Sequence, residues 1–123
     1  MITNFEDITE ELTPLERAEI LPVLVRSLKT KIGKENTISQ GEACAKLKEK
    51  FDWNIRPERW RKMINVIRRY GLVENLVSTS KGYYIATDKM DAWRNIQSIQ
   101  DRINALEELK EPLVEQAIKT FGK

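Results

Sequence analysis

The stretch from Arg56 to Tyr70 constrains the fold most, because its residues separate into two sides at helical spacing. At about 100° per residue, its large apolar side chains fall on one side of a helix: Trp60, Met63, Ile64, Ile67 and Tyr70. Basic and amide side chains gather on the opposite side: Arg61, Lys62, Asn65, Arg68 and Arg69. The apolar side of such a helix can pack in a small core while its cationic side stays exposed to phosphates and base edges. The alternative is a basic side that is only solvated.

Both ends of this helix carry their own signals. Pro57 suits the first helical turn, where its missing N–H has no partner in any case. Proline also pushes the preceding residue out of the α region, so Arg56 is expected to be the N-cap. Gly71 can adopt a positive φ and end the helix.

The charge distribution along the chain favours a polyanionic partner for its middle segment. The chain has 123 residues and a net charge of only +2, which fits one domain with an appended helix. Residues 1–16 carry five acids and no base, and residues 88–123 carry a net charge of −1. Residues 17–87 carry fifteen bases and seven acids, a net charge of +8.

This chain lacks the residues that several kinds of metal site and catalytic site require. There is no histidine, and Cys44 is the one cysteine, so neither an internal disulfide nor a Cys/His zinc site can form. Ser–His and Cys–His nucleophiles are excluded as well. Glycine-rich phosphate loops are absent, and no carboxylate pair is placed for acid–base work. We therefore expect no metal, no cofactor and no catalytic residue, and interpret Cys44 as a small buried side chain.

The sequence predicts a cytoplasmic protein. Its N-terminal segment is acidic and lacks an apolar core, so it does not resemble a signal peptide. The longest apolar run, Ile20 to Val25, is far too short to span a bilayer and contains Pro22.

The first third of the chain predicts an acidic arm followed by a helix. Within residues 1–12, spaced apolar residues and a Thr3-x-x-Glu6 capping box allow a short amphipathic helix, but a loosely docked arm is favoured. Thr13-Pro14-Leu15-Glu16 has the form of a stronger helix start, and the helix is expected to reach about Ile32, where Gly33 follows. Pro22 predicts a kink or break within it.

A second helix and a hairpin flank the basic helix. The segment Ser39–Glu42 repeats the capping box and predicts a helix over about 40–50. After Gly71, the β-prone residues predict strands at 72–77 and 83–86, joined by a polar loop over 78–82.

A long C-terminal helix is expected to begin after Asp88. Its apolar side chains form one stripe at helical spacing: Met90, Trp93, Ile96, Ile99, Ile103 and Leu106. Apolar residues continue beyond Pro112, which marks a kink or a new helix. Such a stripe has to be buried, so this segment either packs back on the domain or pairs with a second copy. Pairing as a homodimer through residues 88–121 is favoured.

This order of elements resembles the winged helix-turn-helix family, an α+β, mostly helical fold of three helices and a β-hairpin wing. The resemblance covers residues 13–87, with residues 1–12 as an arm and 88–123 as a helical extension. Ile38-Ser39 through Leu47 looks like the family's second helix, and Arg56 through Gly71-Leu72 like its recognition helix. Ser80-Lys81-Gly82-Tyr83-Tyr84-Ile85-Ala86 is similar to the tip and returning strand of the wing, as in small winged-helix proteins of bacteriophages and prophages.

The resemblance implies a sequence-specific protein that binds double-stranded DNA, with its recognition helix in the major groove. It would act in transcriptional control or replication in a bacterial or phage-infected cell. Carried over by position, the DNA-binding residues would be Arg56, Arg59, Arg61, Lys62, Asn65, Arg68, Arg69 and Lys81. Asn65 is the first candidate for base reading, and Lys62 and Lys81 for phosphate binding.

A second interpretation stays open, because winged helices also serve as protein-interaction modules. The acidic arm and the apolar C-terminal stripe would suit an adaptor or a phage product that binds a host protein. Binding to duplex DNA near physiological salt separates the two interpretations.

Overall fold

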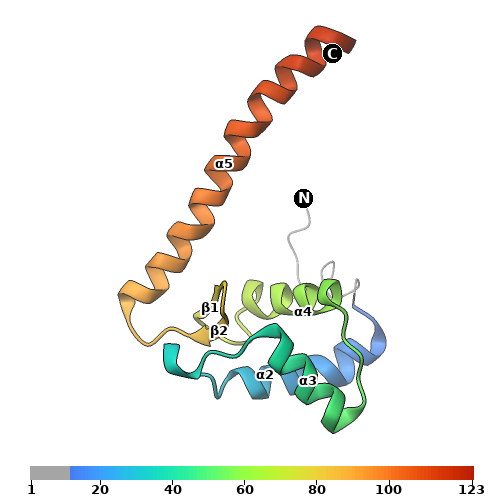
Figure 1. Ribbon diagram of the computed structural model, residues 1–123, viewed down its shortest axis with the longest axis vertical. Coiled ribbons are helices and arrows are strands. Elements are labelled where there is room, and N and C mark those ends of the chain that lie inside the picture. Colours follow the sequence, from blue (N-terminus) through green and yellow to red (C-terminus); the bar gives the residue numbers. More distant parts are fainter. Residues whose placement is uncertain (1–11) are drawn as a thin grey trace. The chain divides into compact units, whose positions relative to one another are not determined.

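The structure is a computed structural model that describes residues 12–123, and the expected acidic arm lies outside them except for Leu12. The fold is α+β and mostly helical, with a small two-stranded antiparallel sheet (Figure 1). The chain divides into two units, Met1–Asp88 and Lys89–Lys123.

The first helix begins at the predicted capping box. The Thr13 N–H donates to Glu16 Oε1 at 2.8 Å, and the Glu16 N–H donates to Thr13 Oγ1 at 3.1 Å. A π-helical segment, η1 (Glu16–Ile20), then continues directly into α2 (Leu21–Leu28). Because Pro22 has no N–H to give to the preceding turn, the expected disturbance takes the form of this wider turn rather than a break.

The helix ends at Leu28, so the prediction that it reaches Ile32 is wrong. The backbone of residues 31–33 pairs with Ile85 instead. Ile85 N–H donates to Lys31 O at 2.7 Å, and Gly33 N–H donates to Ile85 O at 2.9 Å. Backbone groups taken by a distant strand cannot also prolong the helix.

A short 3₁₀ turn, η2 (Lys34–Asn36), leads to α3 (Gln40–Phe51). The predicted Ser39–Glu42 capping box is present, with the Ser39 side chain accepting from Glu42 N–H and the Glu42 carboxylate accepting from Ser39 N–H. These bonds satisfy two backbone donors that the first turn leaves open.

Helix α4 (Pro57–Arg69) has the predicted boundaries. Arg56 is the N-cap in an extended conformation and Pro57 opens the first turn. At the other end Gly71 has φ +65°. The Leu72 N–H returns to Ile67 O at 3.0 Å, which is the six-to-one hydrogen bond of a Schellman cap.

The hairpin consists of β1 (Leu76–Thr79) and β2 (Gly82–Ile85), with Thr79 opposite Gly82. The predicted hairpin is confirmed, but its first strand starts four residues later than expected and the turn is only Ser80–Lys81. Leu72 caps α4, and Asn75 adopts a left-handed φ of 59°, so the segment between them cannot be extended.

The hairpin is joined to the start of α3 through Ile38. Ile38 and Tyr83 exchange both backbone hydrogen bonds, at 3.0 and 2.9 Å. Beside this pair, a Cβ on Gly82 would lie 2.2 Å from Ile38 O, and Gly82 has φ +138°. Glycine is therefore required where the hairpin meets the backbone before α3.

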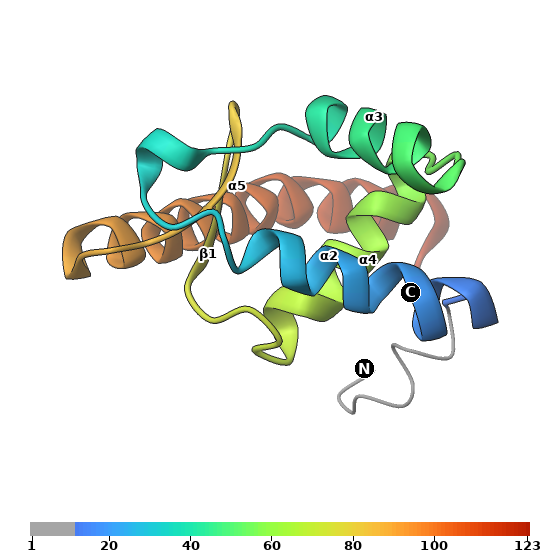
Figure 2. The ribbon, with the colours of Figure 1, turned by 90° about the horizontal axis from the view of Figure 1, so that it is seen from below.

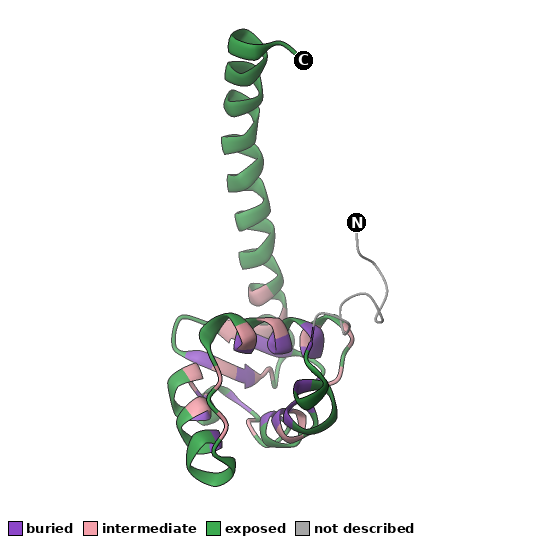
Figure 3. Ribbon diagram, turned by 90° about the vertical axis from the view of Figure 1, so that its right-hand side faces the viewer, coloured by how far each residue is buried: buried purple, intermediate pink, exposed green. Residues whose placement is uncertain are grey.

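One core lies among α2, α3, α4 and the hairpin (Figure 2). Its most deeply buried large side chains come from α2 and α4: Leu24, Leu28, Trp60, Met63, Val66 and Ile67. Figure 3 colours the buried parts of the ribbon purple. The Trp60 Nε1–H donates to Tyr83 Oη at 3.2 Å, so α4 is tied to the hairpin by a polar contact as well as by packing.

The second unit is the single helix α5 (Lys89–Phe121). It continues through Pro112, which was expected to mark a kink or a new helix start. None of its residues is buried, and Figure 3 shows exposure along almost its whole length. Within residues 12–123, no helix combines the length and the apolar character needed to cross a bilayer.

Candidate nucleic-acid interface

Helix α4 presents an exposed polar row opposite its buried side. Arg61, Asn65 and Arg69 follow one another at a spacing of four residues, and all three are exposed. Residues at this spacing lie above one another on a helix. The side of α4 opposite this row is buried in the core, so the helix cannot rotate about its axis and the row stays exposed. The buried residues are Trp60, Met63, Ile64, Val66 and Ile67.

Three further predicted residues border this row. Arg56 is exposed at the N-cap, while Lys62 and Arg68 are half-buried on either side of the row. The Arg69 guanidinium also lies 5.8 Å from the ring centre of Tyr70, which is within the range of a cation–π contact. The exposed surface of α4 is therefore mostly cationic, with Glu58 in the first turn as its one acid.

Arg59 has a partner within the protein that was not foreseen from the sequence. Its guanidinium makes two hydrogen bonds to the Glu16 carboxylate, from Nε at 2.8 Å and from Nη2 at 2.5 Å. Glu16 is only 6% exposed, so Arg59 neutralises a buried carboxylate and joins α4 to the first helix. A contact of Arg59 with DNA would have to be made from within this ion pair.

A signal for this role was present in the sequence. Arg59 precedes Met63 by four residues and Val66 by seven, so it belongs to the edge of the buried side of α4. Glu16 was recognised as a capping residue, but its burial and its partner 43 residues away depend on tertiary structure.

This ion pair makes stability depend on pH in an acidic range. The Arg59 hydrogen bond, followed by bonds from Thr13, lowers the pKa of Glu16 below its ordinary value of 4.5, against the opposing effect of burial. A lowered pKa means stability that is present above pH 4.5 and lost as the pH falls through the lower value. Glu16→Gln should lower the free energy of unfolding at pH 7 by about 1–3 kcal/mol.

The same variant should flatten the pH dependence of unfolding below pH 4.5. Urea denaturation of both proteins between pH 7 and pH 3 measures this. Parallel curves for the two proteins would show that Glu16 is not the titrating group.

The hairpin turn carries the remaining predicted residue, Lys81, which is exposed. The turn is held by Thr79, whose hydroxyl accepts from Lys81 N–H and donates to Gly82 O, both at 3.2 Å. The backbone on which Lys81 stands is thus fixed, while its long side chain extends from the turn.

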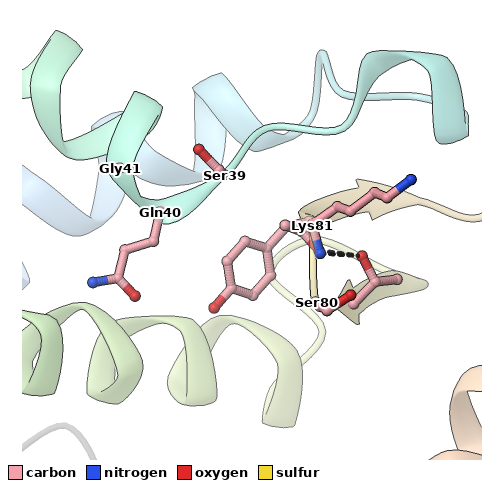
Figure 4. Close-up of a pocket in the computed structure, with 8 residues that line it drawn as sticks. Ser39, Gln40, Gly41, Ser80 and Lys81 are labelled. Carbon is pink, nitrogen blue, oxygen red and sulfur yellow. Dashed lines mark hydrogen bonds between the residues drawn. The ribbon is translucent and has the colours of Figure 1, made fainter.

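A pocket of about 290 Å³ lies between this turn and the start of α3. Ser39, Gln40 and Gly41 line one side, and the turn residues line the other. Figure 4 shows the Lys81 side chain extending away from Gln40, so its ammonium is not directed into the pocket. The Lys81 side chain therefore does not close this pocket.

The chemistry available on this surface is that of binding. Guanidinium and ammonium groups donate hydrogen bonds to anions, and the Asn65 amide can both donate and accept. No group of His, Cys, Asp and Glu residues suited to a metal ion occurs within residues 12–123. Burial raises the pKa of the Cys44 thiol, which disfavours its nucleophilic thiolate form.

Comparison of the chain with known protein families, with curated proteins and with solved structures gave no match.

Proposed function

We propose that the chain is a winged-helix protein that binds double-stranded DNA in a sequence-specific manner, with α4 as its recognition helix. The observation that carries this proposal is the two-sided character of α4. Its apolar side is buried to 4% exposure or less, while Arg61, Asn65 and Arg69 form an exposed row opposite. An α-helix fits the major groove of B-DNA, and its exposed row then meets base edges and phosphates.

The order of elements supports the winged-helix assignment. A helix, a short paired segment at Ile38, helix α3, helix α4 and a hairpin follow one another. The hairpin would be the wing, with Lys81 at its tip. Its backbone pairing with Ile38 links it rigidly to the start of α3, so the wing and α4 would engage DNA as one unit.

Within this proposal, Asn65 reads a base. An asparagine amide can make two hydrogen bonds with the edge of adenine in the major groove, and an arginine can do so with guanine. Asn65 stands between Arg61 and Arg69 at the middle of the exposed row, where the helix axis would come closest to the base pairs. Arg61 then reads a neighbouring base or holds the adjacent phosphate.

Contacts to the DNA backbone come from both sides of this row. Arg56 at the start of α4 and Lys81 on the wing would bind phosphates, which position the protein without reading sequence. The first turn of α3 lies beside the wing. Its backbone N–H groups at Gln40 and Gly41 are of the kind that favour phosphate at a helix start.

Two substitutions separate these roles. A preferred duplex is first selected from a random pool, and affinity is then measured for this duplex and for random DNA. Lys81→Ala should weaken binding to both by a similar factor and lower the salt dependence by about one counterion. Asn65→Ala should instead weaken the preferred duplex by about tenfold to a hundredfold while random DNA changes little.

Equal losses on preferred and random DNA for Asn65→Ala would refute its assignment to base reading. A preferred duplex that cannot be selected at all, despite measurable binding, would restrict the proposal to non-specific binding.

A further inference from the structure

The large apolar side chains of helix α5 form a continuous surface that the helix itself leaves uncovered. At 33 residues it is about 50 Å long, and its large apolar side chains are exposed: Met90, Trp93, Ile96, Ile99, Ile103, Leu106, Leu109, Leu113, Val114, Ile118 and Phe121. Leu106, for example, is 66% exposed. A helix in a folded protein owes most of its stability to packing of its apolar side, so α5 requires a partner.

The centre of α5 follows a heptad repeat. With Ile96 as position a, the a positions hold Ile96, Ile103, Lys110 and Ala117, and the d positions hold Ala92, Ile99, Leu106 and Leu113. Seven of these eight residues are apolar. A repeat of 3.5 residues keeps such a seam facing a second helix along a left-handed coiled coil.

Lys110 occupies one a position, whereas two polar contacts of α5 lie outside this seam. Gln97 Nε2 donates to Asp101 Oδ1 at 2.9 Å, at positions b and f. Arg94 and Asp91 form a contact at 3.4 Å, at positions f and c. Pro112 is also at position c, so the backbone donor that it lacks faces away from a helix docked on the seam.

A second α5 is the occupant that fits this surface. Among residues 12–88, the exposed large apolar side chains are Leu15, Ile32 and Phe51, which belong to three separate parts of the chain. They offer no stripe to match α5. Another copy of α5 offers the same stripe, and Ile103 at a with Leu106 at d is the pairing that favours two strands.

The flanking positions determine the orientation. In a parallel pair, position g of one helix contacts position e of the next heptad in the other. This joins Asn95 with Gln100, Arg102 with Glu107, and Leu109 with Val114 of the second copy. These three pairs match in chemistry: amide with amide, base with acid, and apolar with apolar. The fourth pair of the same register, Gln116 with Phe121, does not match.

An antiparallel pair loses this match. It sets g against g and e against e, and the g positions contain no acid while the e positions contain no base. The g positions are Asn95, Arg102, Leu109 and Gln116, and the e positions are Trp93, Gln100, Glu107, Val114 and Phe121. No antiparallel register can therefore bring Arg102 to an acid at these positions.

We propose that α5 binds a second copy of itself as a parallel two-stranded coiled coil, with its seam from Ala92 to Ala117 and the Arg102–Glu107 pairs setting its orientation. Lys110 at a central a position fixes the register, because each lysine avoids apolar partners by facing the lysine of the other copy. Pairing of α5 is independent of DNA binding, and both tests are made on the protein without DNA.

The first test is the molar mass of the full chain at about 10 µM, measured by sedimentation equilibrium. The chain has a mass of 14.4 kDa, and a species of twice this mass is expected. Ile103→Asp should yield the single-chain mass, because it places a carboxylate in the seam. Ala105→Asp introduces the same group at the outer position c and should leave the dimer intact.

The second test is a charge exchange, which does not rely on a disruptive core variant. Arg102→Glu and Glu107→Arg should each raise the dimer dissociation constant by about tenfold, because each places like charges together. The double variant should return it to within about threefold of the original value.

Three results would overturn the proposal. A single-chain mass for the unaltered protein at 10 µM would show that another occupant, such as residues 1–11, covers the stripe. Equal effects of Ile103→Asp and Ala105→Asp would place the interface elsewhere. A double variant weaker than both single variants would exclude the parallel arrangement.

Discussion

Replacing Trp60 by alanine should lower the free energy of unfolding by about 3–5 kcal/mol, the range for removing a large aromatic side chain from a core. Trp60 is 0% exposed and is the largest of the fully buried side chains. It packs at 5.7 Å from the Tyr83 ring centre and donates its indole N–H to the Tyr83 hydroxyl. The substitution therefore leaves a cavity and also separates α4 from the hairpin.

Guanidinium denaturation followed by far-ultraviolet circular dichroism measures this loss. Leu15→Ala is the control, because Leu15 is 44% exposed and lies outside α5, and it should change the free energy of unfolding by only about 0.5 kcal/mol. Similar losses of unfolding free energy for the two variants would contradict the burial of Trp60 and the packing of α4 against the core.

The double charge reversal Arg56→Glu with Arg61→Glu should reduce affinity for duplex DNA by about a hundredfold or more at 0.1 M salt. Each arginine is exposed on or at the start of α4. Each reversal removes a cation and adds a repelling carboxylate beside the phosphates. Fluorescence anisotropy with a labelled duplex measures the loss.

Net charge alone also affects binding to a polyanion, so the control has to change charge equally. Arg26→Glu with Lys34→Glu makes the same change at exposed residues outside α4 and the hairpin. This control should reduce affinity by about fivefold or less. Equal losses for the two double variants would mean that DNA is attracted to the overall charge and not to α4.

Local signals in the sequence predicted most element starts. The capping boxes at Thr13 and Ser39, the Arg56-Pro57 start and the Gly71 end of α4 are all found as expected. Each of these signals acts within about four residues of chain. Its effect is therefore decided by neighbours in the sequence and depends little on the rest of the fold.

The errors concern backbone groups with distant partners. The first helix stops at Leu28 because Lys31 and Gly33 pair with Ile85, more than fifty residues away. The β-prone residues after Gly71 are not extended from the start, because Leu72 closes α4. The local pattern of apolar residues shows neither the pairing with Ile85 nor the hydrogen bond by which Leu72 closes α4.

The candidate interface was predicted as a group by the periodicity of α4, which assigns Arg61, Asn65 and Arg69 to its exposed side. Arg59 was included for its charge, and its ion pair with Glu16 was not foreseen. Its two neighbours on the same side of the helix, Met63 and Val66, are fully buried. The buried acid that pairs with it, Glu16, could be identified only from the packed structure.

The most direct test of the proposed function is a titration of the unaltered protein with random duplex DNA between 0.05 and 0.2 M salt. The exposed cations of α4 and Lys81 predict that the logarithm of the affinity falls linearly with the logarithm of salt concentration, with a slope of about −4 or steeper. Failure to bind duplex DNA even at 0.05 M salt would contradict the proposal. Capture of a specific protein partner by the same surface would then favour a protein-interaction module.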